Sequence, residues 1–205
     1  DPYWSGPDTQ KNRNARGRTR YMALVDAMDT AIGNVVAALK KKGVLDNTLI
    51  VFCSDNGGII EADNRPLRSG KGDSFEGAIR VPGIACWSGK IKPGSTSSEL
   101  VYMADWYATF AELAGMETES VKDGISAWNV LQGKRGVRRN VPIVSAGRHA
   151  YITGDHALVG GGADYQQLVD NQVQGFEFFD LHADVSQAKA TSAFPEAERE
   201  AEAAL

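Results

Sequence analysis

The chain has 205 residues, of which 42% are hydrophobic and 23% are charged, and its formal net charge is −4 at pH 7. This length suffices for one domain with a substantial core, or for one and a half, and the composition is that of an ordinary soluble globular protein. The acidic balance argues against a nucleic-acid partner, and because no apolar run looks long enough to cross a bilayer, we expect no membrane span.

The first part of the chain predicts a loop, a helix and a strand. Residues 1–20 are polar and rich in cations, which favours a solvated loop or, alternatively, an anion-attracting rim above a site. From Tyr21 to Lys42 apolar residues recur at helical spacing, and Gly43 follows as a natural C-cap. After a turn at Asp46-Asn47, the β-branched run 48–53 predicts a buried strand. This order indicates an α/β architecture.

The second part predicts another strand, a helix and a small sheet. Residues 77–87 suggest a shorter strand at an edge or a bulge, and residues 101–114 suggest a helix. From about Val141 the pattern changes to short β-like pieces between tight turns, which indicates an antiparallel sheet. The tail 195–205 reads as a surface helix. We therefore expect one unit over residues 1–135 and a small second unit over residues 136–205.

Two polar features follow the first predicted strand. Asp55 and Asn56 offer the carboxylate and amide oxygens that hard cations accept, and the glycines after them allow a sharp turn. Further on, Lys71 lies between Gly70 and Gly72. Taken alone, the first feature is more typical of an Asp-Asn-Gly-Gly turn without function than of a metal site. The second feature is also compatible with an exposed lysine in a glycine-rich turn. Together they suggest metal donors beside an anion-binding ammonium.

The cysteines and histidines have structural interpretations. Cys53 and Cys86 form no disulfide framework or metal-finger spacing, and their apolar surroundings predict buried structural thiols. His149 and His156 are expected on the surface or in a hairpin of the small sheet. The alternative is that they contact the leaving-group side of a substrate.

The order of these residues resembles the sulfatase family of the alkaline-phosphatase-like superfamily. The resemblance covers nearly everything from Tyr21 onward. Near the end, Phe179-Asp180-Leu181 followed by Asp184 is similar to the family's C-terminal signature, with Val185 and Gln187 in place of its proline and glutamate. The segments that match the family's other motifs are Asp46-Asn47-Thr48, Ser54-Asp55-Asn56-Gly57, Pro66-Leu67-Arg68-Ser69-Gly70-Lys71, Glu76-Gly77 and Arg80-Val81-Pro82.

The resemblance implies a fold, a cofactor and roles for four residues. The implied α/β fold is the C-terminal part of an alkaline-phosphatase-like mixed sheet sandwiched by helices, plus a small antiparallel-sheet C-terminal subdomain. Asp55 and Asn56 would be ligands of a divalent cation, usually calcium, and Lys71 would hold the sulfate of a sulfate ester substrate. Arg68 would line the site or brace its loop.

The departures from the family concern the nucleophile. The family's formylglycine arises from Cys/Ser-x-Pro-x-Arg, which neither cysteine fits, and Ser5-Gly6-Pro7 is followed by Thr9 where the arginine belongs. We therefore expect a C-terminal portion of a sulfatase, inactive alone, whose partner is the N-terminal part of the same enzyme. Family members are commonly exported, whether periplasmic, secreted or lysosomal. The alternatives are a phosphate or phosphonate ester hydrolase of the same superfamily and a non-catalytic, cation-binding pseudoenzyme module.

Overall fold

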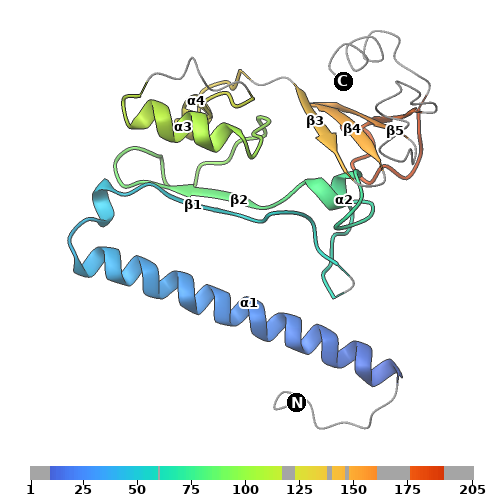
Figure 1. Cartoon of the computed structure of the whole chain (residues 1–205), viewed down its shortest axis with the longest axis horizontal. Helices are drawn as coiled ribbons and strands as arrows, with labels where there is room; N and C mark the ends of the chain where they lie inside the picture. The colour runs from blue at the N-terminus through green and yellow to red at the C-terminus, as the bar shows by residue number, and fades with distance from the viewer. Residues whose placement is uncertain are drawn as a thin grey trace.

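A computed structural model describes residues 10–59, 61–116, 123–137, 140–145, 148–160 and 176–191, with the side chains of residues 10–16 and 176 left aside. A long helix and a two-stranded ribbon form the first part, and a four-stranded sheet forms the last (Figure 1). In the view of Figure 1 the ribbon runs between the long helix on one side and two shorter helices on the other. In chain order the elements are α1 (Gln10–Lys41), η1 (Leu45–Asn47), β1 (Ile50–Cys53), α2 (Glu76–Ile79), β2 (Gly83–Cys86), α3 (Asp105–Leu113), α4 (Trp128–Leu131), β3 (Asn140–Val144), β4 (His149–Thr153), β5 (His156–Gly160) and β6 (Phe176–Asp180).

Helix α1 is longer than its apolar pattern predicts. It begins at Gln10, so the predicted loop over residues 1–20 is wrong for residues 10–20. The segment before Tyr21 is polar but contains no proline within the helix, and arginine and lysine are good helix formers. The predicted end is confirmed: Gly43 has φ +69°, and Val44 N donates to Leu39 O at 3.1 Å, as in a Schellman cap.

The apolar side of α1 is largely uncovered by the described residues. Leu24 is 69% exposed, Val35 is 60% exposed, and Met28 is 44% exposed. The portion Gly17–Lys41 is long and apolar enough to cross a membrane, judged by length and composition alone. The expectation that the chain has no apolar run of sufficient length is therefore wrong by this measure. The reason is that Asp26 and Asp29 are the only charged residues between Arg20 and Lys40, so the apolar residues of this stretch outweigh them. The criterion is weak evidence, because a core helix or a signal sequence also meets it.

Strands β1 and β2 pair antiparallel, with Ile50 opposite Cys86 and Cys53 opposite Gly83. Every residue of β1 is half-buried, and Ile84 of β2 is 61% exposed, so the prediction of a buried strand is wrong for the described chain. The predicted buried thiols are also corrected, since Cys86 is exposed and Cys53 is half-buried. An apolar run shows that a strand is suited to burial, but the surfaces that cover it need not lie among the described residues.

The predicted second strand divides into α2 and β2. Arg80 N donates to Glu76 O at 2.8 Å and Ala78 N donates to Phe75 O at 2.8 Å, which closes a helical turn before the chain extends at Gly83. The predicted helix over residues 101–114 is confirmed for Asp105–Leu113, which form α3, and is wrong for residues 101–104; Gly115 follows its end with φ +71°. The buried carboxylate of Asp105 accepts hydrogen bonds from Tyr102 N at 2.8 Å and Ile125 N at 2.9 Å.

The predicted antiparallel sheet is confirmed, in the order β3-β4-β5-β6. Its core is the best-buried part of the described chain, with Ala157 and Leu158 at 0% exposure and Phe179 at 1%. Phe75, from the loop before α2, inserts into this core and meets Phe179 edge to face at a ring-centroid distance of 5.9 Å. The sheet therefore holds the loop that follows Lys71. The predicted tail helix lies outside the described residues.

His149 is buried, so the interpretation as a surface histidine is wrong for it. It lies on β4 opposite Val144 and Gly160, flanked by a strand on each side, and is 1% exposed. Neither ring nitrogen finds a hydrogen-bond partner among the described residues, and burial lowers the pKa of His149. His156 is half-buried in the hairpin between β4 and β5.

Candidate functional site

The turn after β1 presents Asp55 at the surface. Ser54 Oγ donates to Asn56 O at 3.0 Å, and Asn56 N donates to Asp55 Oδ1 at 3.0 Å. These short-range bonds fix the direction of the chain directly after the strand. Asp55 is exposed and Asn56 is half-buried, so both side chains are accessible.

The two glycines of this region bring two loops into backbone contact. Gly57 N donates to Ala78 O at 2.7 Å, and a Cβ on Gly57 would lie 1.8 Å from Gly77 O. A Cβ on Gly77 would in turn lie 2.4 Å from Arg68 O. No residue with a side chain fits either position without movement of the backbone. The turn that follows β1 therefore packs directly against the backbone of α2.

Asn64 connects the turn to the loop that carries Lys71. Its amide accepts from Gly58 N and donates to Gly58 O, both at 3.0 Å, and Nδ2 also donates to Ser69 O at 3.0 Å. Lys71 N donates to the same Gly58 O at 3.2 Å. The structure thus brings together the segments that carry Asp55, Asn56 and Lys71. Sequence reasoning missed Asn64, because an asparagine in a polar loop gives no signal of three specific contacts.

Lys71 is exposed and lines an open hollow of about 780 Å³. The wall comes from the loop between Gly58 and Asp73 and from Arg148 of the C-terminal part. Asp55 and Asn56 are not among its lining residues. Lys71 therefore lines this hollow. Asp55 and Asn56 lie on the adjoining turn and form no part of its wall.

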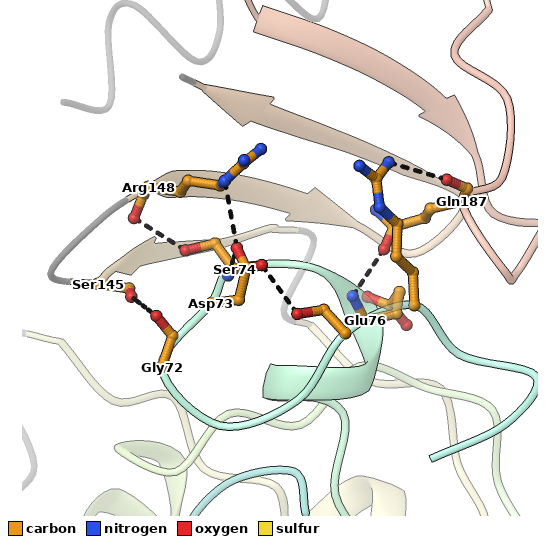
Figure 2. Close-up of polar contacts among 9 residues, drawn as sticks. Gly72, Asp73, Ser74, Glu76, Ser145, Arg148 and Gln187 are labelled. Carbon is orange, nitrogen blue, oxygen red and sulfur yellow. Dashed lines mark hydrogen bonds and ion pairs between the residues drawn. The ribbon is translucent and has the colours of Figure 1, made fainter. Parts of the chain in front are cut away.

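Arg68 braces the loop. Its guanidinium carbon lies 3.7 Å from the centroid of the Phe75 ring, and Nη1 donates to Gln187 O at 3.2 Å. Gln187 is 0% exposed, and its Oε1 accepts from Glu76 N at 2.6 Å, a contact that Figure 2 shows. The sequence pattern gives no sign of this role for Gln187. Its amide links the end of the chain to the start of α2.

Glu76 and Arg80 complete this brace. Arg80 Nη1 and Glu76 Oε2 are 3.3 Å apart and form an ion pair. Burial raises the pKa of Glu76, and the charge and hydrogen bond of Arg80 oppose that rise. The pair holds α2 rather than facing the hollow, which Glu76 does not line.

The donor set at Asp55 and Asn56 is compatible with a hard cation. Within the described residues, no donor reaches Asp55 Oδ2 or Asn56 Oδ1, so both oxygens are available as ligands. Calcium takes about six to eight oxygens, and two side chains supply only part of such a shell. In the part of the chain that the structure describes, no group of three or more His, Cys, Asp or Glu side chains could hold a metal ion.

Removal of the Gln187 acceptor is expected to loosen the start of α2. In Gln187→Met the buried Glu76 N–H loses its partner, which costs about 1–3 kcal/mol and should speed its hydrogen exchange roughly tenfold or more. Gln187→Glu keeps an oxygen for this N–H and is the matched control. Hydrogen exchange over residues 75–79 measures the effect. Equal exchange in Gln187→Met and the unsubstituted protein would contradict this role for Gln187.

Comparison with protein families identifies the region that carries the turn and Lys71. The family model described as Sulfatase matches residues 2–116. Arylsulfatase J of Mus musculus is 39% identical over 129 residues, covering 60% of this chain and 22% of the relative. N-acetylgalactosamine-6-sulfatase of Rattus norvegicus is 37% identical over 125 residues, covering 57% of this chain and 24% of the relative.

Solved structures share the fold over most of the chain. A sulfatase from Pseudoalteromonas sp. superposes with a TM-score of 0.66 at 29% identity, covering 84% of this chain and 39% of that one. A protein solved in complex with its substrate D-glucosamine-2-N,6-O-disulfate gives a TM-score of 0.70 at 26% identity, covering 91% and 39%. The predicted fold class, with its helices and antiparallel sheets, is thereby confirmed. The expected boundary between residues 135 and 136 stays a prediction.

The chain is much shorter than the proteins it matches. It spans 22% to 24% of the curated relatives named above and 39% of the two solved structures. Within that span the family model matches more than half of the chain, including the turn after β1 and the loop of Lys71. The chain belongs to the sulfatase family.

Proposed function

We propose that this chain is part of an enzyme that hydrolyses sulfate esters and that it supplies a sulfate-binding cation and two metal ligands. The observation that carries the proposal is the shared carbonyl of Gly58, which ties the loop of Lys71 to the turn of Asp55 and Asn56. This tie fixes both kinds of group on one rigid segment. The family match supports the reaction class.

Lys71 is proposed to hold the sulfate group. Transfer of a sulfuryl group spreads negative charge over the sulfate oxygens, and a fixed ammonium stabilises that charge where it develops. Gly70 lets the backbone come close to Gly58 O, where a Cβ would lie at 2.3 Å, and Gly72 adopts φ +94°. The side chain of Lys71 is exposed and lines the hollow. Arg68 supports this arrangement as a positioning residue, because its guanidinium is engaged by Phe75 and Gln187.

Asp55 and Asn56 are proposed to be ligands of a calcium ion. A calcium ion bound there would neutralise sulfate oxygens and act as a Lewis acid. Further ligands, and the formylglycine nucleophile of the family, are proposed to come from the part of the sulfatase that this chain does not cover.

The uncovered apolar surface is proposed to be the contact with that remaining part. The exposed apolar side chains of α1 and the exposed Ile84 of β2 lie on elements that are expected to be internal in a complete sheet domain. Both strands of the β1–β2 ribbon also have one unpaired edge within the described chain, where further strands can add. The proposed partner is therefore the N-terminal part of the same enzyme.

Release of inorganic sulfate tests the proposed function. We expect the longest natural protein that contains this chain to release sulfate from sulfated monosaccharides in a calcium-dependent manner, and the 205-residue chain alone to release none. Ion chromatography measures the sulfate, and a calcium chelator followed by calcium restoration measures the metal requirement.

Two other outcomes would replace this proposal. Cleavage of phosphonate or phosphate esters without sulfate release would indicate a different hydrolase of the same fold. Calcium binding by calorimetry without any hydrolysis would indicate a cation-binding pseudoenzyme. Sulfate release by the 205-residue chain alone would show that it needs no further part.

A further inference from the structure

The C-terminal sheet is fastened to the residues that directly follow Lys71 (Figure 2). Ser145 Oγ, at the end of β3, donates to Gly72 O at 3.1 Å. Ser74 Oγ, which is fully buried, donates to Arg148 O at 2.8 Å. Ser145 N donates to the same Arg148 O at 3.1 Å. The backbone of Arg148 is therefore fixed beside the loop of Lys71.

The side chain of Arg148 is also held in place, but only through Nε and the face of its guanidinium. Arg148 Nε lies 3.4 Å from Asp73 Oδ1, and the guanidinium carbon lies 5.1 Å from the centroid of the Phe75 ring. Figure 2 shows the two Nη atoms extending away from Asp73. Within the described chain no acceptor binds these Nη atoms, and the side chain is 38% exposed. An arginine held in this way offers a pre-oriented pair of donors.

Among the described residues, the other charged side chains around the hollow do not bind the Nη atoms of Arg148. Arg65 also lines the hollow, but its guanidinium is paired with Asp63 at 2.5 Å. The remaining carboxylate, that of Asp73, also accepts hydrogen bonds from Ser69 Oγ and Ser74 N, both at 2.8 Å. It can offset only one of the two charges of Lys71 and Arg148. The lining of the hollow therefore carries one net positive charge, which attracts anions.

We propose that Arg148 forms an anion subsite beside Lys71 and recognises a second anionic group on the same substrate molecule. The group is an oxyanion, either a second sulfate or a carboxylate, because the guanidinium fork matches two oxygens of one such group. This inference rests on one part of the proposed function, namely that Lys71 holds the sulfate group that is released. Arg148 is thus a specificity-determining residue, and the preferred substrate class is a polyanionic sulfated sugar.

Calorimetry with non-hydrolysable analogues tests the subsite. The probes are a hexose with one methylene sulfonate, the same hexose with a second sulfonate, and the same hexose with a carboxylate as the second group. We expect the longest natural protein that contains this chain to bind one of the doubly charged probes at least roughly tenfold more tightly than the singly charged probe. The better of the two identifies the second group as sulfate or carboxylate.

Arg148→Gln is expected to abolish this preference while it leaves the affinity for the singly charged probe within about threefold. Arg148→Lys should keep part of the preference. Arg65→Gln is the matched control, because it removes an equal charge from the same hollow where that charge is already paired. A structural role of Arg148 would instead weaken the binding of every probe alike, and that result, or binding of no probe, overturns the proposal.

The same measurements separate this inference from the proposed function. If Lys71→Ala leaves the affinity for the singly charged probe unchanged while Arg148→Gln still abolishes the preference, the role of Lys71 fails and the subsite stands. If Lys71→Ala weakens binding and Arg148→Gln leaves the preference intact, the subsite fails and the role of Lys71 stands.

Discussion

Lys71→Ala is expected to lower kcat for sulfate ester hydrolysis by roughly 10²–10³-fold, the range seen when one preorganised transition-state donor is removed. The loss should appear in KM as well as in kcat, because Lys71 holds the sulfate of the bound substrate and charge on the sulfate oxygens grows further as the transition state forms. The backbone of the loop should persist in the variant, since Lys71 N and not its side chain bonds Gly58 O. Steady-state sulfate release by the longest natural protein that contains this chain provides the measurement.

Two companion variants make the Lys71 result specific. Lys71→Arg keeps a cation and should retain part of the activity, although the guanidinium has a different shape. Lys90→Ala removes an exposed lysine from a distant turn and should leave kcat unchanged. A kcat within threefold of the unsubstituted value in Lys71→Ala would show that the ammonium does not act on the reacting group.

Asp55→Ala is expected to raise the calcium concentration that gives half-maximal activity by about a hundredfold or more, since calcium affinity follows the number of charged ligands. The turn itself should remain partly ordered, because Ser54 Oγ still donates to Asn56 O. Activity measured across a series of buffered calcium concentrations gives this midpoint. Excess calcium should restore part of the rate.

The matched control for the metal site is Asp46→Asn, which changes an exposed carboxylate in η1 without touching the turn after β1. It should leave the calcium midpoint unchanged. Should Asp55→Ala and Asp46→Asn show the same midpoint as the unsubstituted protein, Asp55 would not be a calcium ligand.

The elements that depend on local chemistry could be predicted from the sequence. The strands of the C-terminal sheet follow from short β-branched and aromatic runs between turn residues, and the glycine ends of α1 and α3 follow from the need for positive φ at a C-cap. The expected order of Asp55 and Lys71 on neighbouring loops also agrees with the hydrogen bond that joins their segments. In each case the relevant interactions lie within a few residues or within a repeated pattern.

The remaining features depend on contacts that no local pattern encodes. Gln187 reaches Glu76 across 111 positions of the chain, and a single amide in a polar turn gives no sign of that partner. The burial of His149 depends on strands on both sides of β4. The burial of β1 could not be predicted for a different reason. Its apolar composition shows that the strand is suited to a core, but it does not show whether the described residues supply the surface that covers it.

The backbone contact between Gly57 and Gly77 has a genetic consequence. Every single-nucleotide change of a glycine codon that alters the amino acid adds at least a Cβ, or ends translation. At both positions that atom would overlap a carbonyl oxygen of the neighbouring loop. No missense step at either codon is therefore conservative, and even alanine should behave as a loss-of-function allele. We therefore expect these two positions to tolerate no substitution, whereas the exposed loops on either side can accept substitutions.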